Sequence, residues 1–506
     1  MNRRSLVAAR TPSLGDTLTV PVGNYVSAAL GNYVSETASD LRNFMSADTE
    51  EMDQVRPVIE EFPGRMLGGF ARRDQRANGE LYLRGLMLDG KRKSMQPMAA
   101  RLGVDHQQLR QFVTTSTWDH VEVRRRMAVW AREFIDPRAW AVDDSGFPKD
   151  GRDSPGVARM YCGALGKTGN CQIGVSVHAV TDWASAAPDW RLFLPESWDD
   201  EKTTDEQAAA EIRRRRTRSA IPEQVRHREK WRLALDMLDE IIGWGSPDRP
   251  VVADAGYGDA TEFRLGLTER GLTYVLAVSP TATAHPGYAV PVTPAYSGTG
   301  RPPSPRYLDK PQDLKTLVMA AGRSAGRFVL WRHGSKKTPN NPTASMRSRF
   351  LALRVRPANR NIPRDTDGSL PECWLLAQWP PGAAEPTDYW LSTLPADTRL
   401  RDLVRLAKMR WRIEHDYREL KDGLGLGHFE GRSWLGWHRH VTLTALAQAI
   451  CTQLRHTPKS PCAGLTLYAV LRELQALLAV WTGICHTCRQ PAQTRTREHK
   501  PQPNST

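Results

Sequence analysis

The stretch Pro250-Val251-Val252-Ala253-Asp254-Ala255-Gly256-Tyr257-Gly258 indicates the fold class of this chain. It opens with a short apolar run typical of a buried strand, which ends in a carboxylate and a glycine-rich turn. Helical patterns flank it at 230–244 and 261–270, and another strand is expected at 273–278. Strands that alternate with helices in this way predict a mixed α/β sheet.

Upstream of this stretch the apolar pattern has a period close to two, and strands are expected at 139–142, 172–180 and 190–194. The first of them ends in Asp143-Asp144-Ser145. An acidic group at the C-terminal end of a buried strand is where α/β sheets place reactive residues. Each aspartate taken alone is equally compatible with capping a turn. A metal or catalytic site at these aspartates therefore requires at least one further carboxylate close to them in the folded chain.

A third carboxylate lies in Arg410-Trp411-Arg412-Ile413-Glu414-His415-Asp416-Tyr417-Arg418-Glu419-Leu420-Lys421. On a helix, Arg410, Glu414 and Lys421 share one face, at i, i+4 and i+11. A glutamate between two cations suits a metal–phosphate site, in which Glu414 holds the ion and the cations hold phosphates. The alternative is a solvated helix with ordinary i,i+4 ion pairs. The order strand, strand, helix of the three carboxylates favours the metal site, because Mg²⁺ prefers a few carboxylate oxygens.

This combination resembles the DDE transposases of bacterial insertion sequences. The run Arg410 to Glu414 with Lys421 is similar to their YREK signature, and Asp143-Asp144-Ser145 and Asp254 are similar to their first two aspartate motifs. Longer stretches resemble the insertion sequence four superfamily: Asp143 to Lys149, Gly163 to Gln172, Trp190 to Trp198 and Glu414 to Trp437. The resemblance covers about residues 70–455. Ala407 stands where the signature has its tyrosine, and whether Tyr417 serves instead stays open.

The resemblance implies a ribonuclease H-like mixed-sheet catalytic core, with a β-rich insertion between the second aspartate and the glutamate. It also implies that Asp143, Asp254 and Glu414 are the catalytic and metal-binding residues, with two Mg²⁺ or Mn²⁺ ions as cofactors. Asp144 is the alternative first carboxylate, although the spacing to Ser145 favours Asp143. Residues expected at DNA phosphates are Arg410, Lys421 and Arg412.

The activity that the resemblance implies is cleavage of DNA at element ends and transfer of the 3′-hydroxyl ends to target DNA. The partners are then double-stranded DNA, both terminal inverted repeats and target, and a second copy in a homodimer on DNA. Two alternatives remain: an inactive sequence-specific DNA-binding protein, and a ribonuclease H-like structure-specific nuclease.

The segment from Met98 to Phe112 is typical of a helix-turn-helix, since Ala99 is small where helices would cross and Gly103 suits the turn. Its second helix would present four side chains to base edges, namely Gln107, Gln108, Arg110 and Gln111. An ordinary helical hairpin is the alternative. In the later β-rich region, Trp331 lies among cations and could stack on an unpaired base, or could belong to a small β core.

Composition agrees with a nucleic-acid partner. The 506 residues contain 70 Lys and Arg against 56 Asp and Glu, and the formal charge of +14 favours a polyanion. Seven cysteines are too few for a disulfide framework, so a reducing compartment is expected. No apolar run is long enough for a signal peptide or a membrane span, which predicts a cytoplasmic, nucleoid-associated protein without membrane contact.

The patterns predict six segments: a disordered 1–40, a helical DNA-binding domain at 41–135, the first part of the catalytic core at 136–280, a linker and β-rich insertion at 281–395, the second part of the core with the Glu helix at 396–460, and a C-terminal helix and basic tail at 461–506. Within the core, the run from Arg213 to Arg216 is expected to be a solvated basic loop, with phosphate contact as the alternative.

Overall fold

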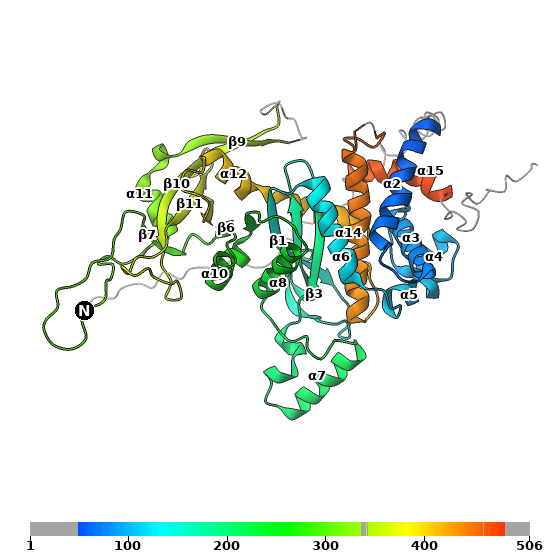
Figure 1. The fold of residues 1–506 in the computed structure, drawn as a ribbon, viewed down its shortest axis with the longest axis horizontal. Coiled ribbons are helices and arrows are strands. Elements are labelled where there is room, and N and C mark those ends of the chain that lie inside the picture. The colour runs from blue at the N-terminus through cyan, green and yellow to red at the C-terminus, as the bar shows by residue number, and fades with distance from the viewer. Residues whose placement is uncertain (1–48, 335–337, 339–340, 342, 459, 481–506) are drawn as a thin grey trace, which may run out of the picture. The chain divides into compact units, whose positions relative to one another are not determined.

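The computed structural model describes residues 49–334, 338, 341, 343–458 and 460–480 (Figure 1). It separates into two compact units, Met1–Gln54 and Val55–Thr506. The segment 1–40 and the basic tail after residue 480 lie outside the described residues. Across the described ranges, no helix combines the length and the apolar character that crossing a membrane requires.

A mixed twelve-stranded sheet dominates the larger unit. Its central strands are β1 (Ala139–Pro148), β3 (Lys167–Val180), β4 (Ser185–Leu192), β5 (Val251–Ala253) and β6 (Tyr274–Val278), with β2 (Ala158–Cys162) beside β3. β3 pairs antiparallel with β1 and β4, whereas β1, β5 and β6 run parallel. The predicted mixed α/β class is therefore confirmed, and β1 continues well beyond the predicted end at residue 142.

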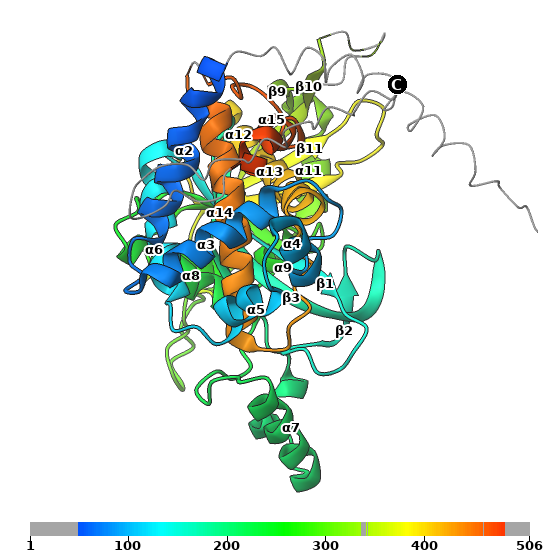
Figure 2. The same cartoon turned by 90° about the vertical axis from the view of Figure 1, so that its right-hand side faces the viewer.

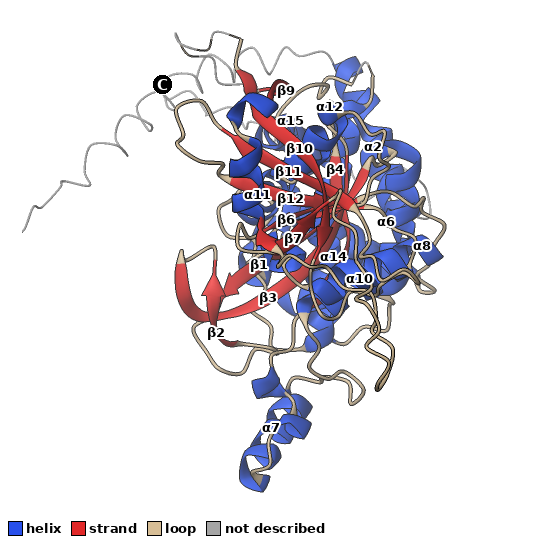
Figure 3. Cartoon of the chain, turned by 90° about the vertical axis from the view of Figure 1, so that its left-hand side faces the viewer, coloured by secondary structure: helices blue, strands red, loops and turns tan. Residues whose placement is uncertain are grey.

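The β-rich region continues the same sheet (Figure 3). Its strands are β7 (Thr283–Pro286), β8 (Gln312–Asp313), β9 (Arg327–His333), β10 (Ser345–Pro357), β11 (Cys373–Trp379) and β12 (Asp388–Ser392). β12 pairs antiparallel with β6, which joins this region directly to the central strands. All six strands lie within 281–395, where the sequence predicts a β-rich region.

The helices are α2 (Thr49–Leu67), α3 (Arg73–Met87), α4 (Met95–Leu102), α5 (His106–Thr114), α6 (His120–Trp130), α7 (Glu206–Arg218), α8 (Lys230–Gly243), α9 (Ala255–Gly258), α10 (Thr261–Glu269), α11 (Leu314–Ala321), α12 (Leu400–Met409), α13 (Trp411–Arg418), α14 (Trp434–His456) and α15 (Leu467–Val480). α13 continues into a π-helical turn at Glu419–Gly423.

The arginine run at 213–216 is helical, so the expected loop is wrong. It forms the second half of α7, which projects away from the sheet (Figure 1). Arg216 is buried and donates to the backbone carbonyls of Trp198, Pro222, Glu223 and Val225. The sequence of four consecutive arginines does not indicate that Arg216 is buried and donates hydrogen bonds to backbone carbonyls.

An apolar core fixes α12 and α13 against the sheet. Ala141 of β1, Val252 of β5 and Val275 of β6 pack in one cluster with Val404 of α12 and Ile413 of α13. Each of these side chains is almost completely shielded from water. The helix that carries Glu414 is therefore held over the strands that carry the two aspartates.

Helix α14 has 19 of its 23 residues buried, because it is covered on two sides. It packs on β4 of the sheet and also on α3, α5 and α6 (Figure 2). Tyr82 of α3 and His440 of α14 share a buried hydrogen bond of 2.8 Å. α14 therefore attaches the N-terminal helices from Val55 onward to the sheet.

Candidate active site

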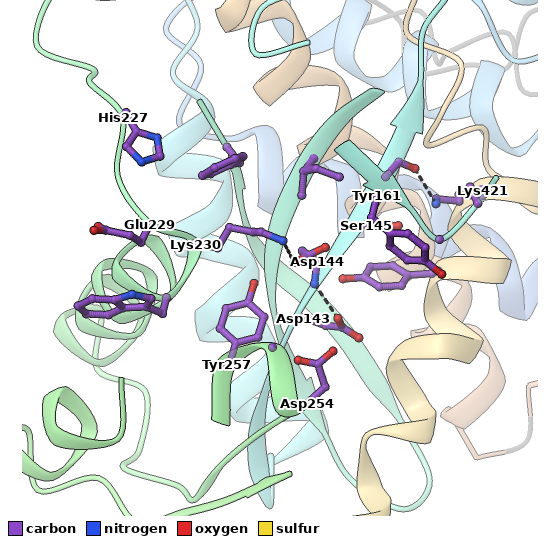
Figure 4. A pocket seen from close by; sticks show the side chains of 18 residues that line it. Asp143, Asp144, Ser145, Tyr161, His227, Glu229, Lys230, Asp254, Tyr257 and Lys421 are labelled. Carbon is purple, nitrogen blue, oxygen red and sulfur yellow. Dashed lines mark hydrogen bonds and ion pairs between the residues drawn. The ribbon is translucent and has the colours of Figure 1, made fainter. Parts of the chain in front are cut away.

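Asp143 lies on β1, and Asp254 lies at the matching position just past the end of the neighbouring parallel strand β5. The register pairs Ala141 of β1 with Val252 of β5, and each aspartate follows two residues later in the chain. Adjacent strands lie about 4.8 Å apart, and residues in matching register face the same side. Backbone pairing thus brings the two predicted carboxylates together, and Figure 4 shows their side chains side by side.

The turn after Asp254 is packed tightly against β6. A Cβ at Gly258 would collide with the carbonyl oxygen of Ala277, which explains why glycine is used there. Asp254 stands at the N-terminus of α9 but makes no side-chain capping hydrogen bond. Its Oδ1 is buried and has no hydrogen-bond partner within the described residues. The turn-capping alternative for Asp254 is therefore excluded.

Asp143 and Asp144 point to different faces of β1, as alternation along a strand requires. Asp143 faces α13, where Nη1 of Arg410 lies 2.5 Å from its Oδ2. Asp144 faces α8, where Nζ of Lys230 lies 2.7 Å from its Oδ2. Asp143 is the one of the pair that faces the Glu414 helix.

Arg410 connects the third carboxylate to the first. Its Nη2 lies 3.4 Å from Oε1 of Glu414, while its Nη1 contacts Asp143. The side chain of Glu414 is 65% exposed, whereas that of Asp143 is 10% exposed. One guanidinium therefore bridges a buried strand aspartate and a solvent-accessible helix glutamate.

The electrostatics of the site reflect this convergence. Burial raises the pKa of Asp143 to about 7, Arg410 counteracts the shift, and Asp254 adds to it. Burial alone would lower the pKa of Arg410, yet Asp143, Asp254 and Glu414 together keep it above its ordinary value. All three predicted carboxylates thus act on the same cation.

The aspartates border a cavity of about 690 Å³. Lys421 also lines it, donates to the carbonyl of Gly146, and has a pKa lowered by burial. Several lining residues were not predicted from the sequence, among them Tyr161 of β2 and Lys230 at the start of α8 (Figure 4). They lie outside the quoted motifs, so only the tertiary fold brings them to the carboxylates.

Tyr417 lines the cavity, but its hydroxyl is engaged elsewhere. It shares a 2.8 Å hydrogen bond with Ser176 of β3, which in turn contacts Nε2 of His178 at 2.9 Å. Nδ1 of His178 lies 2.9 Å from Asp416, whose other oxygen accepts from Ser185 of β4. This buried network ties α13 to two strands. A phosphate-contacting role for Tyr417 would require its hydroxyl to leave Ser176.

Two other predicted residues lie away from the cavity. Arg412 donates to the carbonyls of Thr181 and Asp182. Trp331 packs on the apolar core and contacts Phe350 edge-on with ring centroids 5.5 Å apart. Neither Arg412 nor Trp331 lines the cavity bordered by Asp143 and Asp254.

The predicted helix-turn-helix segment does consist of two helices. α4 and α5 are joined through Gly103, whose φ of 69° is the left-handed conformation that favours glycine. Ala99, Leu109 and Phe112 are buried between the helices, as expected. Of the proposed base-reading side chains, Gln108, Arg110 and Gln111 are exposed and Gln107 is half-buried.

The donor set at the aspartates fits hard divalent cations. Such ions take carboxylate oxygens, and the buried, unpartnered Oδ1 of Asp254 lies beside Asp143, whose ionised form is disfavoured without a compensating charge. A second group, His415, Asp416 and Glu419, also has ligand atoms within 4.8 Å of one another. There, however, Asp416 is bonded to His178 and Glu419 to Arg455, so its charges are already compensated.

The family model described as DDE superfamily endonuclease matches residues 65–338, more than half of the chain. The chain belongs to the DDE superfamily endonucleases. This DDE endonuclease is also 26% identical over 198 residues to a protein described as "Probable transposase for insertion sequence element IS701" from Microchaete diplosiphon. The match covers 38% of this chain and 46% of that relative, so the chain spans under half of the relative's length.

A solved structure, a piggyBac transposase synaptic complex with hairpin DNA, aligns with 85% of this chain and 78% of its own. The TM-score is 0.39 and the sequence identity is 9%.

Proposed function

We propose that this DDE endonuclease is a transposase that cleaves DNA at element ends and transfers the 3′-hydroxyl ends to target DNA. One observation carries the proposal. Asp143 on β1 and Asp254 just past the end of the adjacent parallel strand β5 lie at matching positions, and Arg410 links Asp143 to Glu414 on α13. This is the strand, strand, helix arrangement of carboxylates that the chemistry needs.

We assign the central strands to a ribonuclease H-like catalytic core. The order β4-β3-β1-β5-β6, with antiparallel strands on one side of β1 and parallel strands on the other, supports this assignment. The core would comprise 136–280 and 396–460, with the β-rich insertion at 281–395 and the helical DNA-binding segment at 41–135.

Asp143, Asp254 and Glu414 would hold two Mg²⁺ or Mn²⁺ ions, which when bound polarise the attacking and leaving oxygens of a phosphodiester. The chain's own residues would position the DNA strand. Lys421 has two N–H donors beyond the one on Gly146, and these would hold a phosphate at the cavity mouth. Arg410 would contact a phosphate once another positive charge neutralises Asp143. Asp144, paired with Lys230, is the less suitable ligand.

We propose that α5 reads the terminal inverted repeats through its exposed Gln108, Arg110 and Gln111. Concerted cutting of two ends requires two active sites, so the working species would be a homodimer on DNA. The net charge of +14 favours such a polyanionic complex.

Incubation of the protein with its own element ends, plasmid target and Mg²⁺ tests the proposal. Joined products that carry the 3′ end of the element covalently in the target support a transposase. Cleavage without joining would identify a structure-specific nuclease instead. Specific binding without any cleavage, unaffected by Asp254→Asn, would identify an inactive DNA-binding protein.

A further inference from the structure

The hydroxyl of Tyr257 is a buried hydrogen-bond donor without an acceptor. The side chain is 3% exposed, and its oxygen has no hydrogen-bond partner in the part of the chain that the structure describes. A buried polar group that is left unpaired lowers the stability of a protein. An unpaired group of this kind therefore indicates either a catalytic role or a ligand that completes the hydrogen bond.

This hydroxyl lies at the carboxylates of the candidate active site. Tyr257 lines the cavity that Asp143 and Asp254 border. Figure 4 shows the hydroxyl pointing away from Asp254 and toward the side chain of Lys230. Burial raises the pKa of Tyr257 well above its ordinary value, and the nearby Asp144 and Asp143 raise it further. The phenol therefore keeps its proton and remains a donor.

The carboxylates around the phenol do not accept its proton. Oδ2 of Asp143 accepts from Arg410, and Oδ2 of Asp144 accepts from Lys230. Oδ1 of Asp254 is buried and has no donor among the described residues, yet it does not pair with the phenol. An unpaired acceptor and an unpaired donor beside one cavity indicate two different ligand groups. A cation suits the carboxylate, and an oxygen acceptor suits the phenol.

The phenol is held in place by the packing of α9. Its ring packs against Phe263 of α10, with ring centroids 5.7 Å apart. The following residue, Gly258, lies so close to β6 that a Cβ there would collide with the carbonyl oxygen of Ala277. A donor that is fixed before the substrate binds is the arrangement that stabilises charge in a transition state most effectively.

We infer that the hydroxyl of Tyr257 donates a hydrogen bond to a non-bridging oxygen of the phosphodiester that is cleaved. The inference rests on the proposed function and adds a catalytic residue to it. Lys230 lies on the side to which the hydroxyl points, and its side chain is 41% exposed. A phosphate that attracts this ammonium group away from Asp144 would reach the hydroxyl. Tyr417 is the less suitable donor, because its hydroxyl already bonds to Ser176.

Tyr257→Phe removes only the hydroxyl and separates a catalytic role from a structural one. In EDTA the midpoint of thermal unfolding should stay the same or rise by about 2 °C, because an unpaired buried group is lost. Single-turnover nicking of an element-end duplex in Mn²⁺ should slow by about thirty-fold, since a hydrogen bond to a charged oxygen is lost. The Kd of the duplex in EDTA should change by no more than about two-fold, because the bond strengthens in the transition state. A structural role would instead lower the unfolding midpoint together with the rate.

A duplex with sulfur in place of one non-bridging oxygen at the cleaved phosphate tests the contact directly. Sulfur is a weak hydrogen-bond acceptor, so one of the two diastereomers should slow nicking by the wild type about ten-fold. Mn²⁺ is used because it accepts sulfur as a ligand more readily than Mg²⁺ does. The same diastereomer should slow Tyr257→Phe by no more than about two-fold, because its donor is already absent. If Tyr257→Phe retains the sulfur effect of the wild type, or if the wild type shows none, the inference is overturned.

Tyr389→Phe is the matched control. The hydroxyl of Tyr389 is also buried without a partner in the described ranges, but Tyr389 lies on β12 and does not line the cavity. Its variant should keep the nicking rate and the sulfur effect of the wild type. Loss of the sulfur effect in Tyr417→Phe, with the effect retained in Tyr257→Phe, would assign the contact to Tyr417 and overturn the inference. All these measurements use nicking alone. A wild type that nicks without joining would refute the proposed transposase, while the sulfur effect would still decide the role of Tyr257.

Discussion

Nη1 of Arg410 lies 2.5 Å from Oδ2 of Asp143, and this contact joins the Glu414 helix to the central strand of the sheet. In the metal-free protein, Arg410 supplies the positive charge that the clustered carboxylates need. Divalent cations would supply the same charge when bound. The structure therefore predicts that metal and Arg410 partly substitute for one another in stabilising the fold.

Arg410→Gln should lower the free energy of unfolding in EDTA by about 1–3 kcal/mol, because the buried Asp143 loses its charged partner. Addition of Mn²⁺ should restore most of this loss. Thermal unfolding with and without Mn²⁺ measures both effects. Arg412→Gln is the control, since Arg412 donates to backbone carbonyls and its effect should not respond to metal. An Arg410→Gln deficit that Mn²⁺ leaves unchanged would contradict the prediction.

Asp143→Asn, Asp254→Asn and Glu414→Gln should each reduce strand cleavage by about a thousand-fold, because several kcal/mol of charge stabilisation in the transition state are lost. Binding of element ends in EDTA should persist. Asp144→Asn should reduce cleavage only a few-fold, since Asp144 pairs with Lys230 on the other face of β1. A gel assay of nicked ends in Mg²⁺ compares the four variants. Loss of cleavage in Asp144→Asn with activity kept in Asp143→Asn would reverse the assignment.

The pKa of Asp143 predicts a pH dependence of stability without metal. This carboxyl ionises near pH 4 in the unfolded chain and near pH 7 in the folded one. Between these values the folded state retains a proton that the unfolded state has lost, so the free energy of unfolding falls as pH rises, by at most about 1.4 kcal/mol per pH unit. Asp143→Asn should therefore become more stable relative to wild type from about pH 4 to 7, with no further change above. Urea denaturation in EDTA across this range measures the difference, and a difference independent of pH would refute the prediction.

His178→Ala should destabilise the protein by about 3 kcal/mol, because it leaves the buried carboxylate of Asp416 without its imidazole partner. Ser185→Ala removes one hydrogen bond from the same carboxylate and should cost about 1 kcal/mol. Urea denaturation of the two variants compares these costs. Equal losses would show that the imidazole is no more important to Asp416 than the hydroxyl is.

The sequence predicted the central sheet well because its signals are local. Apolar runs such as 250–254 and 273–278 end in turns and are flanked by amphipathic helices, so β5, β6, α8 and α10 lie within a few residues of their expected bounds. The meeting of Asp143 with Asp254 also follows from strand order, since parallel neighbours place their C-terminal ends together.

Other features depend on contacts between distant segments and give no local signal. Lys230 reaches Asp144 from the start of α8, and Trp331 packs inward although it lies among exposed cations. The continuity of the inserted strands with the core sheet depends on the pairing of β12 with β6, more than a hundred residues apart in sequence. Neither periodicity nor composition determines which strand of an insertion will pair with the core.

The burial of α14 has a mechanical consequence. Because this helix is clamped between β4 and the helices α3, α5 and α6, the exposed side of α5 is held at a fixed distance from Asp143 and Asp254. If α5 binds a DNA duplex at one sequence, the same phosphodiester of that duplex would always lie at the carboxylates. The distance between the recognised repeat and the cleavage point would therefore be fixed by the protein. Insertion of a few base pairs between them should abolish cleavage rather than move the cleavage point.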